Sequence, residues 1–213
     1  MGNQTETKKG KSTLLKDAFV LFAITLVAGL LLSFVYEITK EPIAEAQYQA
    51  KMKAYQTVFV GAEEFVENAG ITEKVNASET VLADAGLTGV TLEEVLEAQT
   101  ADGTTSGYVM TVVGHEGYGG DIKISVGIDL DGVIQGMEVL SMNETAGLGA
   151  KVSGAEFKGQ YKGKKGESIQ YTKTGATKED EIDAISGATI TTKAATNAVN
   201  ACLYFANHVL AEN

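Results

Sequence analysis

The longest uncharged stretch of the chain, residues 18–36, constrains the fold most strongly. It reads AFVLFAITLVAGLLLSFVY, close to the ~20 apolar residues that a helix needs to cross a bilayer. The apolar regions of cleaved signal peptides are shorter, about 7–15 residues. Ala44-Glu45-Ala46 does fit a cleavage-site pattern, but it lies beyond Pro42 in a helical-looking stretch. We therefore predict a single transmembrane helix over 18–36.

The charges on either side of this stretch predict its orientation. Residues 1–17 hold four Lys against two acidic residues, whereas residues 37–213 hold 13 Lys against 26 Asp and Glu. Because Lys and Arg collect on the cytoplasmic side of membrane spans, residues 1–17 are predicted to be cytoplasmic. Residues 37–213 are then extracytoplasmic, and the chain is predicted to be a single-pass protein of the cell membrane.

The composition of residues 37–213 excludes several functions. The region is strongly acidic and the chain contains no Arg, so nucleic acid is not an expected partner. Cys202 is the only cysteine, and His115 and His208 are the only histidines. These residues are too few for a disulfide, a zinc site or an iron–sulfur cluster, and we predict no metal site. Any redox role would need an organic cofactor.

Two helices are predicted between the membrane span and the middle of the chain. Thr39 and Pro42 are typical of the cap and the first turn of a helix, which predicts a membrane-proximal helix over about 42–58 in a segment 37–60. Thr91 and Glu94 resemble a capping box and predict a short helix over about 92–98.

Residues 106–141 have the pattern of an antiparallel sheet. The β-branched run 106–114 is followed by strict alternation, in which the apolar positions are Ile122, Ile124, Val126 and Ile128. A period of two predicts a strand with one buried face. The turn 129–132 then leads to a partner strand over 132–141. With a loop over 156–182 and a helix over 191–210 that includes Cys202, residues 61–213 are predicted to form one α+β domain.

The segment 183–189, Asp-Ala-Ile-Ser-Gly-Ala-Thr, stands directly before the last predicted helix. It resembles the flavinylation motif D-x-x-[ST]-G-A-[ST], in which an FMN transferase uses FAD to join the FMN phosphate to the last hydroxyl. The resemblance implies Thr189 as the acceptor, with Ser186, Gly187 and Ala188 beside the cofactor and Asp183 recognised by the transferase. A Thr hydroxyl has no activation of its own, so an external enzyme is expected. The ester phosphate would lie at a helix N-terminus, which favours anions.

Two alternatives accompany this motif. Ser-Gly-Ala-Thr can also be simply the start of a helix, with Thr191 or Thr192 as a cap. A second Thr-Gly-Ala-Thr occurs at 174–177, but it has no Asp at the required distance and no apolar helix after it. We therefore predict that Thr177 is not modified.

Several motifs together resemble the G subunit of the Rnf complex, the ion-translocating ferredoxin:NAD oxidoreductase of bacterial membranes. A more distant resemblance is to the C subunit of the Na⁺-translocating NADH:quinone reductase. The family's FMN-binding domain is α+β. The segments that carry the resemblance, besides the N-terminal span, are TKEPIAEA (39–46), VFVGAEEF (58–65), SGYV (106–109), ETAGLGAK (144–151) and DAISGAT (183–189).

The segment ETAGLGAK resembles the family's E-T-P-G-L-G, with Ala146 in place of the Pro. The resemblance implies that five of its residues approach the flavin, namely Glu144, Thr145, Gly147, Leu148 and Gly149. Glycines beside a strand end permit such an approach, although an ordinary glycine loop has the same composition.

The resemblance implies an electron-transfer subunit with FMN bound covalently to Thr189. Its expected partners are the membrane, the other subunits of the Rnf complex and, during maturation, the FMN transferase. The protein would turn over no substrate by itself. Two alternatives remain open: a flavin subunit of the quinone reductase or a free-standing extracytoplasmic carrier, and a membrane-anchored binding or assembly protein without redox function.

Overall fold

The computed structural model describes the backbone of residues 6–211 and the side chains of residues 14–211. Lys8, Lys9 and Lys11 of the predicted cytoplasmic segment lie outside the described side chains. The chain divides between Gln49 and Ala50 into two compact units. The fold is α+β, as predicted.

A single helix, α1, runs without interruption over Glu6–Val58 and contains Pro42. From Leu14 onward it is long and apolar enough to cross a membrane. The prediction of a separate helix beginning at Pro42 is wrong. The Thr39 hydroxyl donates to the Val35 carbonyl (2.9 Å), one turn back, instead of capping a new helix. Pro42 removes one backbone donor, and the helix continues past it.

The second unit is built on a five-stranded antiparallel sheet whose strands lie in sequence order. β3 and β4 pair over nearly their full length, with Met110 opposite Val126. The strands β3 to β5 lie where the sequence pattern of residues 106–141 predicted them. The bounds are β1 Glu64–Val66, β2 Val90–Gln99, β3 Thr105–Gly117, β4 Gly120–Asp129 and β5 Ile134–Met142.

The strand β2 occupies the segment that we predicted to be a helix over 92–98, so that prediction is wrong. A bulge between Leu92 and Glu94 shifts the alternation of the strand. Leu92 and Val95 consequently face one hydrophobic core while Leu96 faces the other. Leu92, Val95 and Leu96 lie three positions and then one position apart, as on one face of a helix. This spacing arises because both faces of the strand are covered.

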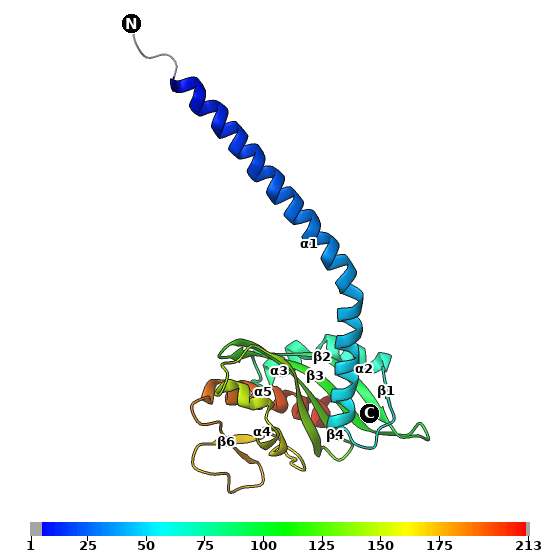
Figure 1. Cartoon of the computed structure of the whole chain (residues 1–213). Helices are drawn as coiled ribbons and strands as arrows, with labels where there is room; N and C mark the ends of the chain where they lie inside the picture. The colour runs from blue at the N-terminus through cyan, green and yellow to red at the C-terminus, as the bar shows by residue number, and fades with distance from the viewer. Residues whose placement is uncertain (1–5, 212–213) are drawn as a thin grey trace. The chain divides into compact units, whose positions relative to one another are not determined.

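The helix α5, Thr189–Tyr204, covers one face of the sheet (Figure 1). It buries Ala195, Val199 and Cys202 completely. The alternating residues Ile122 to Ile128 of β4 face the same core and are fully buried. Burial raises the pKa of the Cys202 thiol, so this cysteine is a small buried hydrophobe.

Shorter elements complete the second unit. Part of the segment 156–182, which we predicted as a loop, carries a short helix and a pair of parallel strands, and the rest of it is loop as predicted. The predicted helix to residue 210 ends as a π-helix. The bounds are α2 Ala69–Asn76, α3 Ser78–Asp84, the 3-10 helix η1 Gly149–Ser153, α4 Ala155–Gly159, β6 Gln170–Thr172, β7 Glu181–Asp183 and the π-helix η2 Phe205–Leu210.

The last turns of α1, from Ala50 to Val58, belong to the second unit and pack on the sheet face opposite α5. Two paired glycines, Gly127 and Gly136, permit this contact. A Cβ on Gly127 would overlap the Val58 carbonyl oxygen, and one on Gly136 would lie 2.9 Å from the Val58 Cα. The Tyr55 hydroxyl also donates to Glu94 on β2. The helix end is therefore fixed to the sheet by close packing and by a partly buried hydrogen bond.

Candidate functional site

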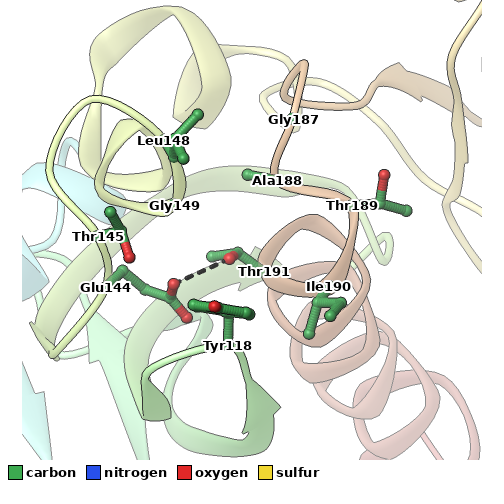
Figure 2. Close-up of a pocket in the computed structure, with 10 residues that line it drawn as sticks. All are labelled: Tyr118, Glu144, Thr145, Leu148, Gly149, Gly187, Ala188, Thr189, Ile190 and Thr191. Atoms are coloured by element: carbon green, nitrogen blue, oxygen red, sulfur yellow. Dashed lines mark hydrogen bonds between the residues drawn. The ribbon is translucent and has the colours of Figure 1, made fainter.

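A pocket of about 490 Å³ lies at the N-terminal end of α5. That volume falls in the range of about 300–1,000 Å³ typical of small-molecule sites. Three segments form it: the β3–β4 hairpin, the loop after β5 and the start of α5 (Figure 2). The lining residues are Tyr118, Glu144, Thr145, Leu148, Gly149, Gly187, Ala188, Thr189, Ile190 and Thr191.

Glu144 connects these three segments through hydrogen bonds. Its Oε2 accepts a hydrogen bond from the Thr191 hydroxyl (3.0 Å) in the first turn of α5 (Figure 2). Its Oε1 accepts one from the Gly119 N–H (3.2 Å) in the hairpin. A carboxylate between two donors from separate segments holds both segments in place.

Gly149 provides the space for this arrangement. A Cβ at this position would overlap Oε2 of Glu144 and lie 2.7 Å from Oγ1 of Thr191. Gly149 is itself buried, so an added Cβ would have to displace the Glu144 carboxylate or the Thr191 hydroxyl from its present position. The requirement at Gly149 is therefore one of space, because its φ is not positive.

If this pocket binds the flavin that the resemblance implies, Gly149→Ala should lower its occupancy several-fold, because the added methyl separates Glu144 from Thr191. Gly159→Ala is a matched control, since a Cβ at Gly159 meets nothing within 4 Å. The flavin-to-protein absorbance ratio of the purified chains measures the effect. Equal ratios in the two variants would show that the space at Gly149 is not needed.

Thr189 is the first residue of α5, and its N-cap, Ala188, makes no side-chain capping hydrogen bond. Thr192 instead stabilises the preceding turn: its hydroxyl accepts from the Ile185 N–H (3.1 Å) and donates to the Ala188 carbonyl (3.0 Å). Within residues 14–211, the Thr189 hydroxyl makes no hydrogen bond. The side chain is half-buried at the edge of the pocket. Its oxygen is thus available for chemistry and is not used as a cap.

The mouth of the pocket is apolar. Tyr118 is 71% exposed, Ile190 53% and Leu148 45%, and Leu148 and Thr189 stand on opposite sides of the pocket (Figure 2). Large exposed apolar side chains gathered around one cavity are typical of a ligand site. An aromatic ring system with an anionic phosphate fits this arrangement, since the phosphate would lie at the uncapped end of α5.

Three residues implied by the resemblance do not line the pocket: Gly147, Asp183 and Ser186. Gly147 has a positive φ of 79° and shapes the loop before Leu148. Asp183 lies in β7, where its Oδ1 accepts from the Ala176 N–H (2.6 Å). The remaining seven, together with Tyr118, Ile190 and Thr191, are brought together by the fold.

The second Thr-Gly-Ala-Thr segment has a different environment from the first. The Thr177 hydroxyl donates to Glu181 Oε2 (3.3 Å), which also accepts from the Thr177 N–H (3.1 Å). Lys178 forms an ion pair with the other oxygen of Glu181 at 2.9 Å. Thr177 is therefore held in a local loop by its bonds to Glu181, and that it is not modified stays a prediction.

The Glu181 loop should show a characteristic pH dependence. The bond from Lys178, followed by that from the Thr177 N–H, lowers the pKa of Glu181 from 4.5 to about 2. A depressed carboxyl pKa stabilises the loop above pH 4.5, and this contribution is lost as the pH falls through about 2. The amide NMR shift of Thr177 should follow this midpoint and become flat in Glu181→Gln. A midpoint near 4.5 would contradict the geometry.

Outside the pocket, His115 lies at the exposed end of β3. Its ring contacts Asp121 Oδ1 and Thr91 Oγ1, each at 2.9 Å. Among the side chains that the structure describes, no group of three or more His, Cys, Asp or Glu is arranged to hold a metal. His115 is best described as an exposed polar residue in a surface hydrogen-bond network.

Sequence reasoning missed three lining residues. Thr191 and Ile190 follow the motif directly, but Thr191 was considered only as a helix cap and Ile190 had no predicted role. Tyr118 lies in a Gly-rich hairpin about 70 residues before the motif and had no signal of its own. Only the pairing of β3 with β4 beside α5 brings it to the pocket.

Comparison with known proteins first shows which domains the chain contains. An FMN-binding domain is recognised over residues 117–204 and an RnfG N-terminal region over residues 7–58. The chain is thus an FMN-binding-domain protein with an apolar N-terminal helix.

Curated relatives identify the family. The chain is 36% identical over 191 residues to the G subunit of the Na⁺-translocating ferredoxin:NAD⁺ oxidoreductase complex of Acetobacterium woodii, covering 87% of each chain. It is 31% identical to the proton-translocating counterpart of Clostridium ljungdahlii, over 86% of this chain and 90% of the relative. The chain belongs to the RnfG family, the G subunits of Rnf complexes.

Two solved structures are similar in part. NqrC of Shewanella oneidensis matches with a TM-score of 0.49 and 26% identity, over 55% of this chain and 60% of that one. The C subunit of the Na⁺-translocating NADH-quinone reductase from Parabacteroides distasonis matches with a TM-score of 0.44 and 21% identity, over 66% and 98%. Because both TM-scores lie below 0.5, these similarities add nothing to the fold assignment.

Proposed function

We propose that this chain is the FMN-carrying electron-transfer subunit of a membrane-bound ion-translocating ferredoxin:NAD oxidoreductase complex, with FMN esterified to Thr189. The observation that carries the proposal is the position of the Thr189 hydroxyl. It lies without a hydrogen-bond partner, among the described side chains, at the edge of an apolar-rimmed pocket. The membership of the family and the recognised FMN-binding domain support the choice of cofactor.

In this proposal, different residues of the pocket have different roles. The uncapped start of α5 offers N–H groups to the ester phosphate. Leu148, Ile190 and Tyr118 provide apolar surface for the ring system. The bound flavin supplies reversible electron transfer, while the protein supplies position and electrostatic environment. No site for a nicotinamide or a ferredoxin is proposed on this chain, and no independent turnover is expected.

The location and the partners follow from the same proposal. The N-terminus would be cytoplasmic and the FMN domain extracytoplasmic, where a covalent bond prevents loss of a scarce cofactor. The stable partners are the other subunits of the complex, and the transient partner is an FMN transferase that recognises the segment 183–189.

Co-expression of the full chain with and without an FMN transferase tests this proposal. We expect flavin fluorescence of the denatured chain in a gel only when the transferase is present, because the Thr hydroxyl is not activated within this protein. A chain that stays colourless with an active transferase would rule out the covalent flavin. The assembly protein without redox function would then be the better account.

A further inference from the structure

The interior wall of the pocket carries one fixed negative charge. Glu144 is the only carboxylate among the ten lining residues. None of these ten residues is a Lys, so no cation on the lining offsets it. On α5, Thr191 contacts this carboxylate through an uncharged hydroxyl, and Lys193 is paired with Glu116 instead.

The direction of that carboxylate is set by Thr191. This residue is only 1% exposed, and its hydroxyl donates to Glu144 Oε2 at 3.0 Å. The Gly119 N–H binds the other oxygen more loosely, at 3.2 Å. Gly149 leaves the space that this arrangement occupies. The carboxylate is therefore held from two sides against the pocket instead of turning toward solvent.

A fixed charge at this place has an electrostatic consequence for an electron carrier. Each electron that enters a flavin without a proton adds one negative charge to the ring. A carboxylate on the wall of the same partly desolvated pocket would oppose that charge. From this geometry we infer that Thr191 is a positioning residue that holds the Glu144 carboxylate toward the flavin, and that the pair lowers the reduction potential of the flavin. This inference rests on the proposed function.

The test is an equilibrium redox titration of the full chain, loaded by co-expression with the transferase, purified in detergent and followed by flavin absorbance. Glu144→Gln removes the charge and keeps the shape, so the ratio of reduced to oxidised flavin at a given potential should rise about ten-fold. Thr191→Val should raise it by a smaller factor, because the unheld carboxylate can turn away. Thr191→Ser, which restores the hydroxyl, should match the wild type.

The double variant separates positioning from general structural damage. If Thr191 acts through Glu144, Thr191→Val should have no further effect in the Glu144→Gln background. An equal effect of Thr191→Val in both backgrounds, or an unchanged ratio in Glu144→Gln, would overturn the inference and leave the covalent flavin intact. If Thr191→Val does not fold, the Glu144→Gln and Thr191→Ser chains still show in which direction the carboxylate shifts the reduction potential. A wild-type chain that takes up no flavin would overturn both this inference and the proposed function.

Discussion

Replacing Thr189 by Ala should abolish covalent flavin completely, the largest effect that we expect from any single substitution. The ester needs an oxygen at this position, and the Thr189 hydroxyl lies at the edge of the pocket without competing hydrogen bonds among the described residues. The methyl of Ala is compatible with the first turn of α5, so the fold should be retained. Intact mass of the chain after co-expression with the transferase measures the result.

Two further variants act as controls for this experiment. Thr189→Ser keeps a hydroxyl in the same place and should still accept flavin. Thr177→Ala removes the hydroxyl of the second Thr-Gly-Ala-Thr, which Glu181 already binds, and should leave flavin content unchanged. Flavin that persists in Thr189→Ala, or that disappears in Thr177→Ala, would mean that the acceptor has been assigned to the wrong residue.

Replacing Gly127 by Ala should destabilise the second unit by about 2–3 kcal/mol, the cost of overpacking a tight contact. A Cβ here would overlap the Val58 carbonyl oxygen and lie 2.9 Å from the carbonyl carbon. Both belong to backbone, which cannot rotate away as a side chain could. The end of α1 would have to lift from the sheet, and the contacts of Tyr55 and Phe59 would be weakened as well.

Thermal unfolding of the full chain in detergent measures this effect. At about 2–4 °C per kcal/mol for a domain of this size, the midpoint should fall by about 5–10 °C. Gly159→Ala is again the control, because its Cβ would meet nothing, and its midpoint should be unchanged or slightly higher. If both variants unfold at the same temperature, the close contact between α1 and the sheet does not contribute to stability.

The parts of the fold that were predictable from sequence are those with a regular pattern. The alternation from Ile122 to Ile128 predicted β4 because its large apolar side chains all face the core under α5. The opposite face is covered as well, but it carries the small residues Ser125 and Gly127, so the alternation remains visible in the sequence. The strand β2 could not be recognised, because its bulge and its two covered faces remove the alternation. The separate helix predicted to begin at Pro42 failed for another reason. The chain stays helical through the proline despite the lost backbone donor, and Thr39 bonds one turn back instead of capping.

The candidate site was predictable only where a motif marks it. The residues around Thr189 and the loop from Glu144 to Gly149 carry local motifs, and most of them line one pocket. Asp183 belongs to the same motif but lies in β7, where it holds the neighbouring loop. The contribution of Tyr118 depends on strand pairing across the sheet, and the Thr191–Glu144 bond joins residues 47 positions apart. No local sequence pattern predicts either of these contacts.

The central claim is tested most directly by peptide mass spectrometry of the protein isolated from its native membrane. Trypsin cleaves after Lys178 and Lys193 and so places Thr189 in the peptide 179–193, separate from Thr177 in the peptide 174–178. Our account predicts one FMN ester on the peptide 179–193, with fragmentation placing it on Thr189. An unmodified peptide 179–193, or an ester on 174–178, would contradict the account.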